Sequence, residues 1–171
     1  RAQWVGRGEP FRPLDGGGVY FAGKTGQSAA APTSFTLIGC DREGDTVRSV
    51  WQCQLDNRIV DVQYTFRLWQ KSLVVDVQCP GGEIGEVRVG QFVGAVAPRL
   101  ATVPYLTGAE QRPAILISGT SDAPLFASVL LDHCRTNSSL FWFTNQVVDE
   151  GVALNGGAQY LPKTDGQRND C

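Results

Sequence analysis

Apolar and polar residues alternate strictly within the segment 34–79. Along 58–69, apolar side chains occupy every second position, at Val60, Val62, Tyr64, Phe66 and Leu68. Polar residues and Trp69 fill the positions between them. A period of two is typical of a β-strand with one buried face. The whole segment therefore predicts four consecutive antiparallel strands, a meander.

Two short turns set the register of this meander. Asp56-Asn57 and Gln70-Lys71 each separate two alternating runs, and Asp and Asn tolerate the positive φ that tight hairpins need. The first turn pairs Cys53 with Val60, Trp51 with Val62, Ser49 with Tyr64 and Val47 with Phe66. The second pairs Leu68 with Leu73, Phe66 with Val75, Tyr64 with Val77 and Val62 with Cys79. A slip of one residue would move every apolar side chain to the other face, so the register is constrained.

The meander should have one apolar and one polar face. Phe35 and Leu37, in the strand before the loop 41–45, belong to the apolar face, and Cys40 to the other. The polar face should carry the cross-strand pairs Arg48–Thr65, Gln52–Asp61, Thr65–Asp76 and Gln63–Gln78. Such pairs are typical of a solvated face. The alternative is a surface for sugar hydroxyls, with Trp69 as a stacking platform.

The rest of the chain consists of short apolar runs between Gly and Pro turn signals. Strands are expected at 86–91, 114–118 and 125–131, and at 151–154 and 158–161 around a hairpin turn at Asn155-Gly156-Gly157, while 140–144 is an apolar and aromatic run. No segment shows helical periodicity over three turns. The predicted fold class is all-β, an antiparallel β-sandwich. We expect a single domain over 1–171, with a loop-rich part at 1–33.

Composition excludes several classes of partner. The 171 residues include 15 basic and 17 acidic side chains, a net charge of -2, and no basic stripe, which argues against nucleic acid. The apolar runs are too short to span a bilayer, so no membrane partner is expected. The chain contains no Met and begins Arg-Ala-Gln-Trp, which suggests a segment of a longer protein, or a processed one.

No cofactor or metal is predicted. The five cysteines match no zinc spacing, and His133 is the one histidine. Cys53 and Cys79 flank the central strand on opposite sides, about 10 Å apart at a strand spacing of about 4.8 Å, too far for a disulfide. We expect both to be buried thiols. Asp15-Gly16-Gly17-Gly18 lacks the Lys-Ser/Thr of a phosphate loop and is interpreted as an ordinary loop.

No catalytic residue is assigned. His133 and Cys134 are adjacent, and adjacent residues of a strand point to opposite faces, so they cannot act as a base–nucleophile pair. Asp61 and Asp76 share the polar face but stand in different rows, and neither has the apolar setting that raises the pKa of a general acid. Enzymatic activity of the isolated chain is therefore not expected.

The turn-rich tail 155–170 is the densest cluster of polar and charged groups. Asp, Asn and Arg side chains make directional hydrogen bonds of the kind that fix sugar hydroxyls. The carbohydrate-binding candidates are Asn155, Tyr160, Asp165, Arg168 and Asp170, together with Trp69. A plain solvated loop is the alternative interpretation.

Ordered short motifs in 46–170 carry a family resemblance. They are Arg88-Val89-Gly90, Pro98-Arg99-Leu100, Val103-Pro104-Tyr105-Leu106, the run 131–139 from Leu131-Asp132-His133 to Ser138-Ser139, and the run 155–170 from Asn155-Gly156-Gly157 to Arg168-Asn169-Asp170. Together they resemble large bacterial glycoside-hydrolase-like proteins that are common in planctomycetes. In those proteins a β-sandwich similar to galactose mutarotase precedes a catalytic barrel. His133-Cys134 departs from the pattern, since aromatic residues are expected there.

The resemblance implies a role and a setting. This chain would be the N-terminal sandwich, its partner a C-terminal catalytic barrel of the parent protein, and its location periplasmic or secreted. Asp165, Arg168 and Asp170 would lend a loop to the substrate cleft. The first hypothesis is thus a non-catalytic sandwich module that contacts carbohydrate. The alternative is a structural or interaction domain that buttresses a neighbour without a ligand, and a free-standing hydrolase comes third.

Overall fold

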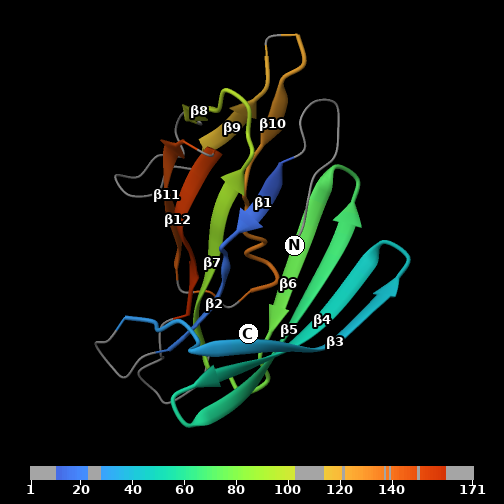
Figure 1. Cartoon of the computed structure of the whole chain (residues 1–171), viewed down its shortest axis with the longest axis vertical. Coiled ribbons are helices and arrows are strands. Elements are labelled where there is room, and N and C mark those ends of the chain that lie inside the picture. Colours follow the sequence, from blue (N-terminus) through green and yellow to red (C-terminus); the bar gives the residue numbers. More distant parts are fainter. Residues whose placement is uncertain are drawn as a thin grey trace. The chain divides into compact units, whose positions relative to one another are not determined.

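The described residues form β-strands and turns without any helix (Figure 1). The computed structural model describes residues 11–22, 28–102, 114–120, 122–136, 138, 140–149 and 151–160. Because the described residues include no helix, they include none that could cross a membrane. The pairings that join the strands are antiparallel wherever their register is defined, which confirms the all-β antiparallel class.

The described part of the chain contains twelve strands. They are β1 (Arg12–Asp15), β2 (Gly18–Phe21), β3 (Ser34–Glu43), β4 (Thr46–Leu55), β5 (Arg58–Trp69), β6 (Ser72–Gln78), β7 (Ile84–Val93), β8 (Arg99–Thr102), β9 (Ala114–Ser118), β10 (Leu125–Ala127), β11 (Leu140–Val148) and β12 (Gly151–Gln159).

The described chain divides into two compact units. One contains the residues up to Gly18 and those of Val87–Gln159, and the other contains Val19–Glu86 with Tyr160. The boundary runs through β7. The single-domain sandwich stays a prediction.

The second unit contains the predicted meander. Its sheet has the strand order β3-β4-β5-β6, drawn from blue-green to green in Figure 1. The predicted pairs of the two hairpins are confirmed from Val47–Phe66 to Leu55–Arg58 and from Leu68–Leu73 to Tyr64–Val77. Asp56 and Gln70 open the two turns with φ of 51° and 53°. Alternation and turn chemistry therefore determined this register together.

A β-bulge in β3 overturns the prediction for Cys40. Leu37 is opposite Trp51, but Gly39 is opposite Val50, so Ile38 is an extra residue. The extra residue reverses the alternation beyond it. Cys40 is consequently opposite Ser49, on the apolar side of the sheet, and not on the polar side as expected.

The core of this unit gathers at one end of the meander. Its buried side chains come from β2, from β4 and β5, and from the segment that leads into β7, and they are Val19, Phe21, Cys53, Leu55, Val60, Val62, Cys79 and Ile84. Cys53 and Cys79 are buried free thiols, as expected. Burial, with smaller contributions from Cys79 and Asp61, raises the pKa of Cys53.

The first unit is built from two further sheets. One has the order β1-β7-β12-β11, with β2 also paired to β7, and the other has the order β10-β9-β8. Six buried side chains form its core: Phe11, Val89, Phe92, Leu116, Val152 and Leu154. The predicted strand at 114–118 is confirmed, whereas the one at 125–131 ends at Ala127 and the one at 86–91 extends to both sides.

The predicted hairpin turn at Asn155-Gly156-Gly157 is wrong. These residues lie inside β12, which pairs without a break with β11 from Gly151–Val148 to Gln159–Leu140. A Cβ on Gly157 would stand 1.9 Å from the carbonyl oxygen of Val87 in β7. The glycine is therefore needed for close approach of two strands, and the turn of this hairpin follows Val148 instead.

Candidate functional site

The polar face of the meander collects the hydrogen-bonding groups of the second unit. The register places on this side the charged, amide and aromatic side chains of Asp41, Glu43, Arg48, Gln52, Gln54, Asp61, Gln63, Arg67, Trp69, Asp76 and Gln78 and the hydroxyl side chains of Ser34, Thr36, Thr46, Thr65 and Ser72. The apolar Val50, Ile59 and Val74 share the same side. Asp41, Arg48, Thr65 and Asp76 form one row across all four strands. Each predicted cross-strand pair is opposed as expected.

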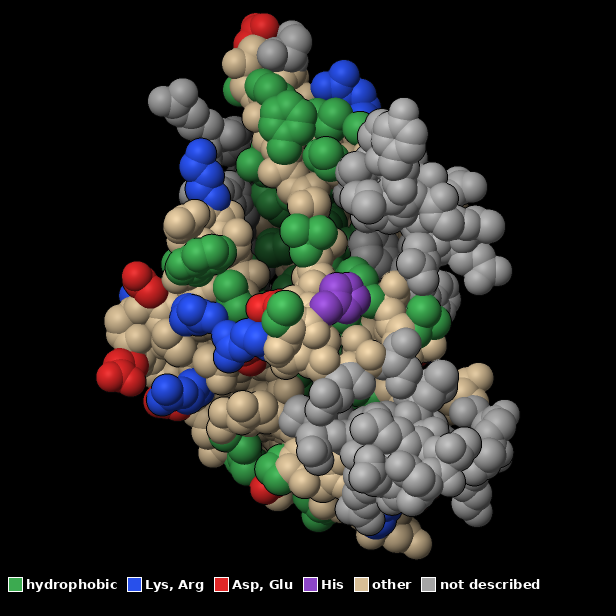
Figure 2. Space-filling model, turned by 180° about the vertical axis from the view of Figure 1, so that it is seen from behind, with side chains coloured by type: hydrophobic (Ala, Val, Ile, Leu, Met, Phe, Trp, Pro, Cys, Tyr) green, Lys and Arg blue, Asp and Glu red, His purple; other side chains and the backbone are tan. Residues whose placement is uncertain are grey.

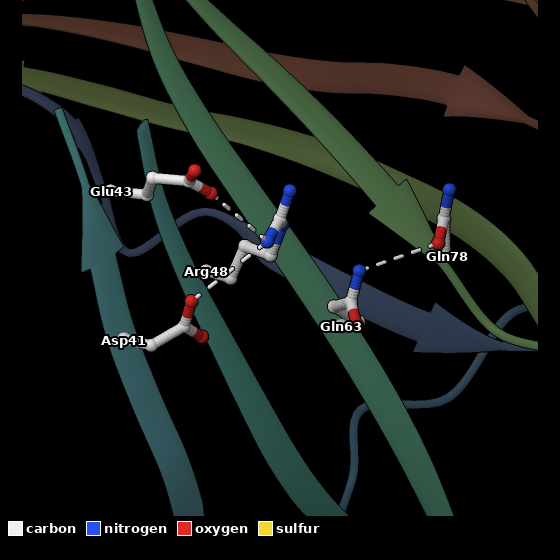
Figure 3. Close-up of polar contacts among 5 residues, drawn as sticks. All are labelled: Asp41, Glu43, Arg48, Gln63 and Gln78. Carbon is white, nitrogen blue, oxygen red and sulfur yellow. Dashed lines mark hydrogen bonds and ion pairs between the residues drawn. The ribbon is translucent and has the colours of Figure 1, made fainter. Parts of the chain in front are cut away.

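Arg48 lies between two carboxylates of the edge strand (Figure 3). Its Nη1 is 3.9 Å from Asp41 Oδ2 and 3.9 Å from Glu43 Oε2. Ion pairs at this distance between exposed side chains contribute at most a few tenths of a kcal/mol. The three groups therefore keep hydrogen-bonding capacity for another partner.

A second polar pair joins β5 to β6. Gln63 Nε2 donates to Gln78 Oε1 over 3.4 Å (Figure 3). Each carboxamide has two donors and an acceptor with two lone pairs, so this one long bond uses a small part of what the pair can offer. The row of carboxylate, guanidinium, hydroxyl and amide groups is chemically suited to a polyhydroxylated ligand.

Trp69 stands at the end of β5 on this same face. It is 58 % exposed and lies opposite Ser72. Thr65 is four residues away along the strand, about 13 Å at about 3.3 Å per residue. An exposed indole about 13 Å from the polar row on the same face can stack on one ring of an extended ligand while the row binds hydroxyl groups of another part of it.

The tail candidates are placed only in part. Asn155 is an exposed residue inside β12, opposite Thr144 in the first unit. Tyr160 belongs to the second unit, where its backbone N–H donates to the carbonyl of Gly85 over 2.9 Å. Asp165, Arg168 and Asp170 lie outside the described residues. Asn155 and Trp69 thus belong to different units, and a shared site at the tail stays a prediction.

Asp61 and Asp76 do not stand at glycosidase spacing on the polar face. Asp61 is opposite Gln52, and Asp76 is opposite Thr65. Because Thr65 is four residues from Asp61, the two carboxylates are offset by about 13 Å along the strands. The separations that glycosidases use are roughly 5–9.5 Å.

His133 and Cys134 lie in a turn of the first unit, and not on a strand as expected. The Cys134 N–H donates to Asp132 Oδ1 over 3.1 Å, and the His133 ring centroid is 6.5 Å from that of Phe141. The histidine, purple in Figure 2, is exposed. Over the described residues, no three His, Cys, Asp or Glu side chains are grouped as for a metal ion.

The apolar face of the meander shows a feature that sequence reasoning missed. Phe35, Leu37 and Leu68 are 66 %, 47 % and 57 % exposed, although alternation predicts burial for all three. Aromatic rings continue this face, with Phe35 against Trp51 at 5.9 Å and Tyr64 against Phe66 at 6.1 Å. Periodicity identifies the side of a sheet, but it carries no signal for how much of that side is covered.

Tyr64 marks the better covered part of the apolar face. Burial raises the pKa of its hydroxyl to about 12, although a backbone hydrogen bond from Val19 favours the ionised form. The meander therefore buries its apolar side near β2 and leaves it open toward β3 and the turn after Trp69.

Comparison with protein-family models, with curated proteins and with solved structures found no significant match.

Proposed function

We propose that this chain is a non-catalytic β-sandwich module that contacts carbohydrate, within a larger polysaccharide-processing protein. The observation that carries the proposal is the exposed Trp69, which shares one sheet face with a row of hydrogen-bonding groups. The short-motif resemblance supports the sandwich architecture and the setting next to a C-terminal catalytic barrel. The tail at 155–170 remains a second contact surface in this proposal.

The chemistry of the polar face favours a neutral glycan. Sugar hydroxyls both donate and accept, and the carboxylate, guanidinium and carboxamide groups of this face serve both needs. Four carboxylates, at Asp41, Glu43, Asp61 and Asp76, outnumber the guanidiniums of Arg48 and Arg67 by two. Polyuronates and sulfated glycans should bind more weakly, because like charges would oppose them.

The sharpest test uses two neighbouring residues. Trp69 and Leu68 are almost equally exposed, at 58 % and 57 %, but point to opposite faces of β5. In calorimetric titrations with neutral plant and algal oligosaccharides, Trp69→Ala should weaken binding at least about tenfold, as expected for an aromatic anchor. Leu68→Ala should leave the affinity unchanged. No binding of any neutral glycan at millimolar concentration, or equal losses in the two variants, would refute the proposal.

The second candidate is a structural or interaction domain that buttresses the next domain of the parent protein. It is favoured by the exposed apolar side chains of Phe35, Leu37 and Leu68. Phe35 and Leu37 are neighbours on one face of β3, whereas Leu68 lies six residues along β5 from Val62, which is in the row of Leu37. An exposed apolar patch such as that of Phe35 and Leu37 is a mark of protein–protein contact. In the parent protein, amides of β3 should exchange hydrogen more slowly than in the isolated chain. Equal exchange rates would argue against this candidate.

A further inference from the structure

The strand β3 is an edge with one open side. Nine of its ten residues pair with β4, all except the bulge residue Ile38, and within the described part of the chain no other strand pairs with it. Figure 1 shows it as the outermost strand of the meander. An edge strand presents a row of unpaired N–H and C=O groups, which are satisfied best by another extended backbone.

The two halves of this edge differ in protection. Asp41, Arg42 and Glu43 place three charged side chains on its second half. Charges and bulges are devices by which proteins prevent strand addition. The bulge residue Ile38 lies at the end of the uncharged half, three residues before Asp41. The first half, Ser34–Ile38, has no charged residue, and its Phe35, Leu37 and Ile38 are all about half exposed or more.

We propose that Ser34–Ile38 is the interface for a second copy of this chain. The two β3 strands pair antiparallel about a twofold axis at Thr36. Thr36 then lies opposite Thr36 of the second copy, Phe35 opposite its Leu37, and Ser34 opposite its Ile38. The proposal uses the sheet edge and does not depend on the proposed carbohydrate contact.

Self-complementarity supports a second copy as the occupant. The twofold gathers four apolar side chains, two Phe35 and two Leu37, on one face and places two threonines together on the other. Aromatic–aliphatic and Thr–Thr neighbours are favourable cross-strand pairs. A closed twofold pair also uses each edge once, so the association ends at a dimer.

Charge disfavours a twofold within the charged half of the edge. A twofold at Arg42 would place Arg42 opposite Arg42 and Asp41 opposite Glu43 of the second copy, and like charges in opposed positions are destabilising. With the twofold at Thr36, Asp41, Arg42 and Glu43 lie beyond the five-residue ladder and meet no like charge, since residues 29–31 of the second copy are three alanines. Ala30 is already paired with Phe21, so the ladder itself ends before these residues.

A disulfide tests the register directly. Opposed residues of an antiparallel pair have Cα atoms about 4.5–5.5 Å apart, within the range that a disulfide spans. In a chain carrying Cys40→Ser, Cys134→Ser and Cys171→Ser, Thr36→Cys should form covalent dimers on mild oxidation. The control chain carries only Cys134→Ser and Cys171→Ser, so that Cys40 and Thr36 are native. It should form at least tenfold less covalent dimer, because Cys40 faces Pro32 of the second copy. Efficient dimer formation through Cys40 rather than through the cysteine at 36 would overturn the register.

Sedimentation tests the association without any cross-link. A five-residue ladder buries less than a standard interface, so the native chain should dimerise reversibly only at high concentration, up to about 500 µM. Leu37→Lys should weaken the dimer at least tenfold, whereas Leu68→Lys, on the same face but on β5, should not. Far-UV circular dichroism confirms that each variant is folded. A native chain that stays monomeric throughout, or an equal loss in Leu68→Lys, would overturn the proposal.

Discussion

Gly157 offers the most direct test of how β12 is built. An alanine at this position would place its Cβ 1.9 Å from the Val87 carbonyl oxygen and 2.8 Å from the Arg88 Cα. Ordinary contact begins at 3.4 Å, so β7 and β12 would have to move apart by about 1.5 Å. Both obstacles are backbone atoms, which cannot rotate away as a side chain can.

The loss of stability has two contributions, overpacking and broken hydrogen bonds. Overpacking of a close-packed site costs about 1–3 kcal/mol. Loss of two ladder hydrogen bonds adds about 1 kcal/mol each. Gly157→Ala should therefore lower the free energy of unfolding by about 3–5 kcal/mol, or by about 1.5–2.5 M in urea midpoint at an m-value of about 2 kcal/mol/M.

Gly39→Ala is the matched control for this experiment. Gly39 also lies in a strand, but a Cβ there would meet nothing within 4 Å. This variant should be neutral or more stable by up to about 1 kcal/mol, through the unfolded state. Urea unfolding followed by circular dichroism compares the two. If Gly157→Ala came within 1 kcal/mol of Gly39→Ala, the close approach of β12 to β7 would be refuted and a turn at Asn155-Gly156-Gly157 would regain support.

Three further outcomes are expected. Val62 is fully buried, so Val62→Ala should lower the free energy of unfolding in urea by about 2 kcal/mol. Ile59 is 65 % exposed on the same strand, so Ile59→Ala should change it by less than about 0.5 kcal/mol. Equal effects would contradict the register. The Tyr64 pKa of about 12 lies above its ordinary value, so the hydroxyl ionises first in the unfolded state. The free energy of unfolding should therefore fall as the pH rises from about 10 to 12. Tyr64→Phe should flatten this part of the curve of stability against pH. With Cys171→Ser, a thiol reagent should modify exposed Cys40 and Cys134 rapidly and buried Cys53 and Cys79 only on unfolding, and fast labelling of all four would contradict their burial.

The meander was predictable because two independent signals agreed. The alternation at Val60, Val62 and Tyr64 indicated which side of the sheet is apolar, and the turns at Asp56 and Gln70 fixed the alignment of the strands. Position 69 follows from the same parity, so the sequence placed Trp69 on the polar face. Its 58 % exposure could not be predicted, because exposure depends on what covers a sheet and not on its period.

The errors arose where one residue type has two physical uses. Asn-Gly-Gly is a good turn sequence, yet glycine is also the residue that allows two backbones to approach closely. Only the neighbour at Val87 decides between these uses, and it lies about seventy residues away along the chain. Cys40 was misplaced for a related reason, since Gly39 next to Ile38 is a bulge signal, but a glycine inside a strand has other uses as well.

That bulge leads to a last prediction, on deletion rather than substitution. Because Ile38 is extra, its removal leaves Leu37 opposite Trp51 and Gly39 opposite Val50, and every later side chain of β3 keeps its face. Deletion of Gln52, within the regular part of β4, would instead move one side of that strand to the wrong face. The first deletion should cost no more than about 1 kcal/mol, whereas the second should prevent cooperative unfolding. The Ile38 deletion should also straighten the open edge and increase self-association in sedimentation, because a bulge bends an edge away from strand addition. A chain that fails to fold without Ile38 would show that the residue is part of the regular ladder, and the account of Cys40 would then be wrong.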